Sequence, residues 1–284
     1  MKVFKGKVAV VTGGASGIGR ALAEKCVQED MKVILADVEE NSLRETQEEL
    51  KSIGGEVLAI RTDVSQSDEV KALADRTFTT YGEVHLLFNN AGVMGNKEQA
   101  IWERSLTDWQ WGIGVNLWGI IYGVHYFVPQ MLEQNSEGHI VNTASIAGLI
   151  SSSSFISGGE YRTSKHGVVA LTETLALDLE KRGNKLKTSI LCPGLVNTRI
   201  MEAERNRPKT LHDESKDKAQ VSHEMTIKAQ AALQATMPTS EVAEMVFDAI
   251  RQEKFYILTH PEVKPLVQRR MEHIIYEHMP VDIS

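Results

Sequence analysis

The stretch VVTGGASGIGRAL, residues 10–22, joins a run of apolar residues to a helical pattern through a loop rich in glycine. A helix that begins directly after such a loop presents unpaired backbone N–H groups, to which an anion can bind. Gly13, Gly17 and Gly19 would let a phosphate approach those donors, because glycine has no side chain to hold it away. The alternative interpretation is a tight strand-to-helix turn that binds nothing.

The apolar run before this loop is one of seven that are rich in valine, isoleucine and leucine. These runs lie at residues 7–12, 32–37, 56–63, 84–90, 139–145, 187–193 and 255–260. Such continuous runs are typical of strands buried on both faces. Helical patterns lie between them, at about residues 17–30, 40–53, 66–81, 107–135, 160–182 and 239–252. The alternation predicts an α/β fold: a doubly wound Rossmann fold whose seven-stranded parallel sheet has helices on both faces.

The length and composition favour a single domain. The chain has 284 residues, 42% of them hydrophobic, so it can bury one large core, and we expect one domain over residues 1–284. Residues 198–238 interrupt the alternation with polar, charged and methionine-containing sequence. A connection of that length is usually a lid or a binding element. Residues 261–284 form a C-terminal extension.

Several classes of partner are excluded by composition. The net charge is −7 without a basic block, which argues against nucleic acid or an anionic membrane surface. The N-terminus runs into the first strand pattern without a cleavage site, and no apolar run is long enough to span a membrane. Cys26 and Cys192 lie in apolar patterns typical of buried, reduced thiols. We therefore expect a cytoplasmic protein, and the nine histidines show no metal-ligand spacing.

An acidic residue follows the glycine loop at the spacing of a dinucleotide site. Asp37 ends the second strand pattern, twenty residues after Gly17, where a carboxylate can accept hydrogen bonds from the ribose hydroxyls of adenosine. A 2′-phosphate would be repelled there, and Ser16 and Val38 offer it no cation. The predicted cofactor is therefore NAD. Because methyltransferases place a glycine loop and an acid similarly, the adenosine site alone does not define the chemistry.

Further motifs follow in order along the chain. They are TGGASGIG (12–19), Asp63-Val64, NNAG (89–92), Asn116, Ser145, YRTSK (161–165) and PGLVNT (193–198). Together they resemble the short-chain dehydrogenase/reductase family in its single-domain branch. The resemblance implies an NAD-dependent enzyme that interconverts a secondary alcohol and a ketone.

The resemblance assigns the chemistry to four residues. Tyr161 and Lys165 share one helix face, and the resemblance makes Tyr161 the acid–base group. The Lys165 ammonium and the oxidised nicotinamide would favour the phenolate, and Lys165 would also hold the nicotinamide ribose. Ser145 would hydrogen-bond the substrate oxygen. Asn116 would anchor a water that feeds Lys165, although a core amide satisfied by backbone is the alternative.

The expected cofactor-binding residues extend beyond the glycine loop. The resemblance implies that residues 90–92 form a wall behind the adenosine ribose, and a role in the stability of the fourth strand is compatible with this. Thr198 and Val196 would lie beside the pyrophosphate and carboxamide, with a simple turn after Pro193 as the alternative. The complete set is Gly13, Ser16, Gly17, Ile18, Gly19, Asp37, Asp63, Val64, Asn90, Ala91, Gly92, Tyr161, Lys165, Pro193, Gly194, Val196 and Thr198.

The sequence departs from the family between Ser145 and Tyr161. Fifteen residues separate them, three more than family members commonly have. We expect a longer loop around an intact site, because Ser145 belongs to a strand, Tyr161 belongs to a helix, and closure entropy grows slowly with loop length. The other serines of this stretch, Ser151, Ser152, Ser153, Ser154, Ser157 and Ser164, are predicted to be loop and cap residues.

Apolar residues in the lid predict a bulky, uncharged substrate, such as a cyclic terpenoid or a steroid-like alcohol. They are Ile200, Met201, Leu211, Met225, Ile227, Leu233 and Met237, with Phe155 and Ile156 on the opposite wall. Packing against a neighbouring subunit is the alternative role for these side chains. The long helices around 107–135 and 160–182 resemble those that pair family members into homodimers or homotetramers. An epimerase or dehydratase, and a silent NAD-binding sensor, are the alternative functions.

Overall fold

The computed structural model describes residues 1–95, 100–151, 158–212, 235–280 and 282. Within these residues the chain forms one seven-stranded, all-parallel sheet in the order β3-β2-β1-β4-β5-β6-β7. The strands are β1 (Val8–Thr12), β2 (Lys32–Asp37), β3 (Glu56–Arg61), β4 (Leu86–Asn89), β5 (Gly138–Thr143), β6 (Leu186–Cys192) and β7 (Tyr256–Leu258). The predicted Rossmann fold is confirmed, and each strand lies within or beside its predicted range.

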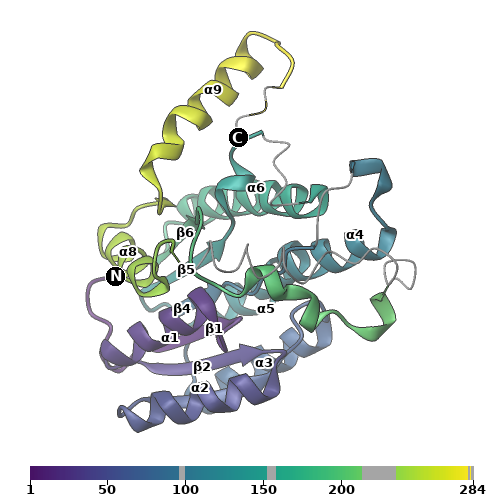
Figure 1. Ribbon diagram of the computed structural model, residues 1–284. Coiled ribbons are helices and arrows are strands. Elements are labelled where there is room, and N and C mark those ends of the chain that lie inside the picture. Colours follow the sequence, from purple (N-terminus) through teal and green to yellow (C-terminus); the bar gives the residue numbers. More distant parts are fainter. Residues whose placement is uncertain (96–99, 152–157, 213–234, 281, 283–284) are drawn as a thin grey trace.

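Helices cover both faces of this sheet (Figure 1). The helices of the described residues are α1 (Gly17–Gln28), α2 (Glu40–Ser52), α3 (Ser67–Tyr81), α4 (Leu106–Ile113), α5 (Gly119–Glu133), α6 (Gly159–Arg182), α8 (Thr239–Gln252) and α9 (Lys264–Ile275). Side chains of α1, α2 and α8 share one core cluster, and side chains of α3, α5 and α6 share a second. The sheet separates the two clusters.

Strand β1 shows why its sequence is apolar throughout. Ala9 and Val11 point into the core under α1 and α8, whereas Val8 and Val10 point into the core under α3 and α5. Neighbouring side chains of a strand point to opposite faces, so a strand covered on both sides needs apolar residues at every position. This is the physical basis of the continuous runs seen in the sequence.

The sheet order reverses beside β1, which places a crevice at its carboxyl end. Strand β1 pairs with β2 on one side and with β4 on the other. The connections that leave β1 and β4 therefore run in opposite directions, and the gap between them is the usual ligand position in doubly wound folds.

The long helix predicted at 107–135 is interrupted. Helix α4 passes into a π-helical turn, Gly114–Trp118, before α5 begins. Asn116 lies in this turn and is fully buried. Short π-helical turns inside helices widen the backbone locally and often occur at functional sites.

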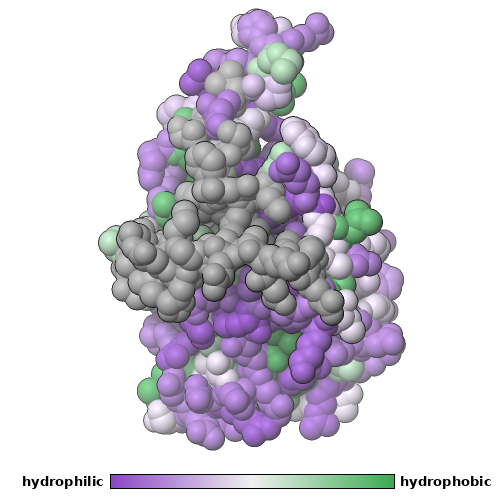
Figure 2. Space-filling model, turned by 45° about the vertical axis from the view of Figure 1, so that its right-hand side comes forward, coloured by the Kyte–Doolittle hydropathy of each residue, from purple (hydrophilic) through white to green (hydrophobic). Residues whose placement is uncertain are grey.

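The C-terminal extension contains a helix that the sequence analysis did not predict. Helix α9 extends away from the sheet in Figure 1, and none of its residues is buried. The described residues on the face in Figure 2 are mainly hydrophilic, with scattered hydrophobic ones among them. No helix in the described part of the chain combines the length and apolar character that a membrane crossing requires.

His139 in β5 gives the fold a specific dependence on pH. The side chain is fully buried and its Nε2 lies 2.7 Å from Ser189 Oγ. Burial lowers the pKa of His139 from 6.5 to about 3. Between these two values His139 is protonated in the unfolded chain and neutral in the folded chain. The free energy of unfolding should therefore decrease as the pH falls below 6.5. The decrease amounts to at most about 1.4 kcal/mol per pH unit.

His139→Gln should flatten this dependence. Urea unfolding of both proteins between about pH 7 and pH 4 measures it. Some slope should remain, because burial also lowers the pKa of His85. Equal slopes for the two proteins would contradict the neutral, buried imidazole.

Candidate active site

A cavity of about 530 Å³ opens at the carboxyl ends of the strands. Its wall combines the β1–α1 loop, the ends of β2, β4 and β5, the start of α6 and the segment after β6. All the predicted site residues line this cavity except Gly19 and Asn116. Residues from six of the seven motifs, together with Asp37, thus meet at the crevice that the sheet order defines.

The glycine loop follows β1 with the geometry that the sequence predicts. Gly13 and Gly17 have φ angles of +65° and +56°, a conformation that favours glycine. A Cβ at Gly19 would lie 2.0 Å from the Gly13 carbonyl oxygen, so a side chain does not fit there. Ser16 and Gly17 line the cavity where α1 begins. The backbone at Gly13 and Gly17 is therefore accessible from the cavity, whereas Gly19 packs tightly against Gly13 on the side away from the cavity.

Asp37 is held at the end of β2 by backbone donors. Its Oδ2 accepts a hydrogen bond from the Ala15 N–H, and its Oδ1 accepts one from the Glu39 N–H, both at 3.0 Å. Burial raises the pKa of Asp37, and these hydrogen bonds act in the opposite direction. The carboxylate is fixed in position and faces the cavity.

The interpretation that no cation lies near Asp37 is wrong. Arg199 and Arg205 line the same cavity as Asp37. Arg205 donates from Nε and Nη2 to Oε1 of Glu39, at 3.0 and 2.6 Å. The two arginines follow β6 and are far from Asp37 in the sequence, so local sequence could not place them.

The loops after β3 and β4 form the wall beside the glycine loop. Thr12 Oγ1 accepts hydrogen bonds from the N–H groups of Asn90 and Ala91, at 2.9 and 3.1 Å. Asp63 Oδ1 accepts hydrogen bonds from the backbone N–H and the hydroxyl of Ser65, at 3.0 and 2.7 Å. These bonds connect the NNAG motif to β1 and keep the Asp63-Val64 turn compact.

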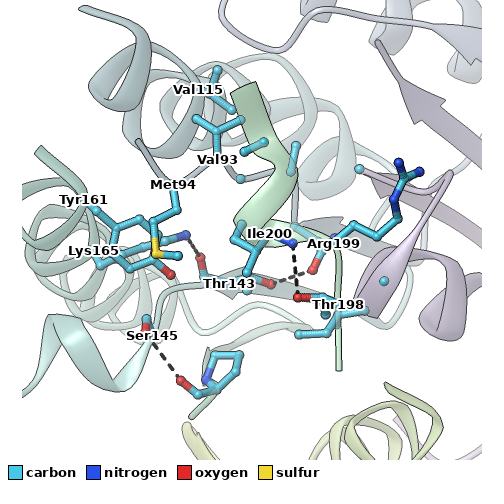
Figure 3. Close-up of a pocket in the computed structure, with 18 of the residues that line it drawn as sticks. Val93, Met94, Val115, Thr143, Ser145, Tyr161, Lys165, Thr198, Arg199 and Ile200 are labelled. Carbon is cyan, nitrogen blue, oxygen red and sulfur yellow. Dashed lines mark hydrogen bonds between the residues drawn. The ribbon is translucent and has the colours of Figure 1, made fainter. Parts of the chain in front are cut away.

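Tyr161, Lys165 and Ser145 converge from α6 and from the end of β5 (Figure 3). Ser145 caps a short 3₁₀ turn: its Oγ accepts from the Ala147 N–H at 3.1 Å and donates to the Pro193 carbonyl at 3.4 Å. The Ser145 hydroxyl is near enough to the Tyr161 phenol to influence its pKa. Lys165 Nζ donates to the Thr143 carbonyl at 2.9 Å and lies 5.5 Å from the centre of the Tyr161 ring.

Burial changes the acidity of both α6 groups. It raises the pKa of Tyr161, against the opposing effect of the Ser145 hydroxyl. It lowers the pKa of Lys165 to about 8, against the opposing effect of Cys192. Each shift favours the neutral side chain, because a charged group loses hydration in an apolar surrounding. A bound cation beside the phenol would reverse the effect on Tyr161.

Asn116 contacts backbone and a serine. Its Oδ1 accepts from the Val93 N–H at 2.8 Å, and its Nδ2 donates to the Val93 carbonyl at 2.9 Å and to Ser164 Oγ at 3.2 Å. A Cβ built on Gly92 would lie 3.4 Å from Asn116 Oδ1 and 3.5 Å from Lys165 Nζ. The amide is satisfied by backbone, as in the alternative interpretation, and Gly92 lies beside both Asn116 and Lys165. The relay water remains a prediction.

Ser164 is a buried helix residue, so its assignment to a loop or cap is wrong. Its Oγ donates to the Tyr161 carbonyl at 2.7 Å and accepts from Asn116. It connects the π-helical turn to the first turn of α6, next to Tyr161. The i, i+3 spacing within YRTSK is the only signal in the sequence that could have suggested this contact.

The segment after β6 closes one side of the cavity. The Gly194 N–H donates to Thr259 Oγ1 at 3.1 Å, and Val196 pairs with Met237. A Cβ on Gly17 would lie 3.2 Å from Thr198 Cγ2, so this segment touches the glycine loop.

The predicted lid is only partly described. Ile200 and Met201 line the cavity, as predicted. Met237 instead is partly buried against the core under α1 and α8, and it forms an isolated parallel bridge with Val196. Outside the described residues lie Ser152, Ser153, Ser154, Phe155, Ile156, Ser157, Met225, Ile227 and Leu233. Among the described residues no group of three or more His, Cys, Asp or Glu could hold a metal ion.

Comparison with known proteins identifies the class. The family model described as short chain dehydrogenase matches residues 7–209, and the chain belongs to this family. The CLA biosynthesis dehydrogenase/reductase of Lactiplantibacillus plantarum is 33% identical, over 99% of this chain and 97% of that protein. The 1-deoxy-11-beta-hydroxypentalenate dehydrogenase of Streptomyces arenae is 30% identical, over 97% and 89%. The resemblance drawn from the motifs is confirmed.

A solved structure agrees over the whole chain. The short chain dehydrogenase/reductase from Burkholderia phymatum, in complex with NAD, has a TM-score of 0.92 and 46% sequence identity, over 100% of this chain and 99% of that one. The similarity supports oxidoreduction at a CH–OH group, since the Streptomyces relative is named for a hydroxyl compound that it dehydrogenates.

Proposed function

We propose that this protein is an NAD-dependent oxidoreductase that interconverts a secondary alcohol and a ketone. The observation that carries the proposal is the convergence of Ser145, Tyr161 and Lys165 on the cavity that also contains the glycine loop. An acid–base group and a cofactor cradle in one cavity are what hydride transfer to or from a CH–OH carbon requires.

The residues present fit a nicotinamide dinucleotide. Gly13 and Gly17 expose backbone without side chains, and the fixed carboxylate of Asp37 can accept the adenosine ribose hydroxyls. Asn90, Val196 and Thr198 would complete the walls of this site. When bound, the nicotinamide supplies the hydride acceptor or donor. The carboxylate of Asp37 and the NAD in the Burkholderia relative support NAD over NADP.

Tyr161 would move the proton. In the oxidative direction its phenolate removes the proton of the substrate hydroxyl, and in the reductive direction its hydroxyl returns that proton. Ser145 and Tyr161 would both hydrogen-bond the substrate oxygen as charge develops on it. Burial lowers the pKa of Lys165 to about 8. In its protonated form, the Lys165 ammonium stabilises the Tyr161 phenolate.

The substrate side of the cavity favours a bulky apolar molecule. Its lining includes Val93, Met94, Trp111, Val115, Ile150 and Leu266. These side chains come from the segment after β4, from α4 and the π-helical turn after it, from the segment after β5, and from α9. Such a wall would bind a cyclic hydrocarbon skeleton through apolar burial, and it offers few partners to a sugar or a small hydroxy acid.

A panel of alcohols tests this proposal directly. With NAD present, the formation of NADH absorbance should be fastest with a bulky cyclic secondary alcohol. It should be at least about tenfold slower with a polyol or a hydroxy acid of similar size, because their polar groups lose hydration without replacement. Best turnover on a small charged hydroxy acid would refute the apolar substrate. NADH binding without turnover of any alcohol would favour a nucleotide sensor instead, and isomerisation or water loss without net NADH would favour an epimerase or dehydratase.

The assembly and its surroundings are also part of the proposal. We propose one domain over residues 1–284 that forms a homodimer or homotetramer in the cytoplasm. The exposed apolar side chains of Trp118 and Leu177, beside α5 and on α6, support an interface on these helices. Cys26 and Cys192 are free and buried, as expected in a reducing compartment.

A further inference from the structure

The segment that follows β6 places a cation beside the proposed ribose site. It contains a 3₁₀ helix, Ile200–Asn206, which lines the cavity through Ile200, Met201 and Ala203. Arg205 extends from this helix to Glu39, two residues after Asp37. Asn206 Nδ2 donates to the same Glu39 oxygen at 3.0 Å. The first residues beyond β2 are thus tied to the segment beyond β6.

The Arg205 guanidinium is held in place by backbone as well. Its Nη1 donates to the carbonyl oxygens of Arg199 and Glu202, at 3.1 and 2.9 Å. The next anchor is Arg207, which is buried and donates to Asp108 Oδ1 at 2.7 Å. The contacts of Arg205 with backbone and of Arg207 with Asp108 do not involve Glu39. Removal of the Glu39 side chain should therefore leave Arg205 close to its present position.

Glu39 neutralises this cation. Burial of Glu39 acts to raise its pKa, but hydrogen bonds from Arg205 and Asn206 outweigh that effect and hold the pKa below its ordinary value. Glu39 is therefore anionic at neutral pH and forms an ion pair with Arg205. The Glu39 N–H in turn donates to Asp37 Oδ1 at 3.0 Å, so the pair adjoins the carboxylate that would contact the ribose.

The charged residues around Asp37 explain how Arg205 is compatible with an NAD site. Two cations, Arg199 and Arg205, lie on this side of the cavity. Arg199 Nε donates to Glu202 Oε2 at 2.8 Å, and Arg205 pairs with Glu39. Together with Asp37, the two ion pairs leave a net negative charge. A 2′-phosphate would be repelled by the Asp37 carboxylate, and it could not bind Arg205 because Glu39 already pairs with that guanidinium. Without Glu39, the same guanidinium would have two free donors, and guanidinium groups pair well with phosphate.

We propose that Glu39 is a second cofactor-selecting residue, which keeps Arg205 from binding the 2′-phosphate of NADP. This inference rests on the proposed NAD-binding function. Asp37 excludes the phosphate by repulsion, and Glu39 excludes it by occupying the cation that would otherwise attract it. Removal of Asp37 alone should therefore reduce the preference for NAD over NADP. A preference for NADP should appear only when both Asp37 and Glu39 are replaced.

Binding of NADH and NADPH, measured by titration calorimetry, tests the inference without any substrate. Glu39→Ala should tighten NADPH binding relative to NADH by about tenfold, the effect of about one charged hydrogen bond. Asp37→Ala/Glu39→Ala should bind NADPH more tightly than NADH. Adding Arg205→Met to that double variant should remove the gain, because Arg205 is the proposed phosphate partner.

Glu40→Ala is the matched control. Glu40 is the adjacent carboxylate, is exposed and pairs with Arg44 on the outer side of α2. The Glu40→Ala substitution removes the same charge as Glu39→Ala. It should leave the ratio of the NADPH and NADH affinities within about twofold of wild type, since exposed ion pairs contribute little. If Glu39→Ala does not fold, Glu39→Gln keeps the shape and should shift the ratio in the same direction.

The outcomes separate this inference from the function on which it rests. A wild-type protein that binds neither dinucleotide would refute the proposed function. Tight NADH binding with the same affinity ratio in Glu39→Ala and Glu40→Ala would overturn only the role of Glu39. An NADPH gain that survives Arg205→Met would show that another group binds the phosphate, and it would overturn the inference as well.

Discussion

Tyr161→Phe should reduce alcohol oxidation by about 10³-fold or more while leaving NADH affinity within about twofold. The substitution removes the hydroxyl that would carry the proton and keeps the aromatic ring in place. Lys165 retains its hydrogen bond to the Thr143 carbonyl, so the cofactor side of the cavity should be unchanged. Steady-state rates with the best alcohol, together with calorimetric titration of NADH, measure both effects.

Ser145→Ala is the comparison for this variant. Its loss should be smaller, because Ser145 would share the substrate oxygen with Tyr161 and would transfer no proton itself. The variant also loses the cap of the 3₁₀ turn, so its melting temperature should be recorded alongside the rates. Activity of Tyr161→Phe within tenfold of wild type would show that another group moves the proton.

Gly19→Ala should abolish NADH binding, raising the Kd by at least about a hundredfold. Its methyl group would lie 2.0 Å from the Gly13 carbonyl oxygen and 2.6 Å from Asn90 Nδ2, so the glycine loop must move. Overpacking of this kind also costs about 1–3 kcal/mol of stability. NADH titration and thermal unfolding measure the two consequences on the same sample.

Gly114→Ala is a suitable control because its added methyl group would have only an ordinary contact, 3.6 Å from Ser65 Cβ. It should bind NADH like wild type and unfold at nearly the same temperature. A normal Kd for Gly19→Ala would mean that the loop accommodates a side chain, contrary to the tight packing behind it.

The strands and most of the site could be predicted because their signals are local. Each buried strand needs apolar residues on both faces, which produces the seven continuous runs. Gly13, Asp37 and Ser145 follow strands that end at the same edge of a parallel sheet, so order along the chain implied proximity in space. The same logic placed Tyr161 and Lys165, since residues four apart in a helix share a face.

Features that depend on contacts between distant segments could not be predicted. The Arg205–Glu39 pair joins positions 166 residues apart, and neither residue has a distinctive sequence context. The π-helical turn at Asn116 is set by tertiary contacts with Val93 and Ser164. Met237 resembled a lid residue by composition, but the structure shows it partly buried against the core under α1 and α8 and bridged to Val196.

The position of Arg207 on Trp111 has a spectroscopic consequence. The guanidinium lies 4.3 Å from the centre of the indole, and Trp111 is only 2% exposed, whereas Trp102 is 83% exposed. A buried indole emits at shorter wavelength than one in water. The chain has three other tryptophans, Trp102, Trp109 and Trp118, and replacing them by Phe would isolate the emission of Trp111. Any displacement of the segment that carries Arg207 changes the surroundings of this fluorophore. The protein thus contains a natural fluorophore at the cavity wall, and stopped-flow fluorescence would report whether the segment that carries Arg207 moves when a dinucleotide is added.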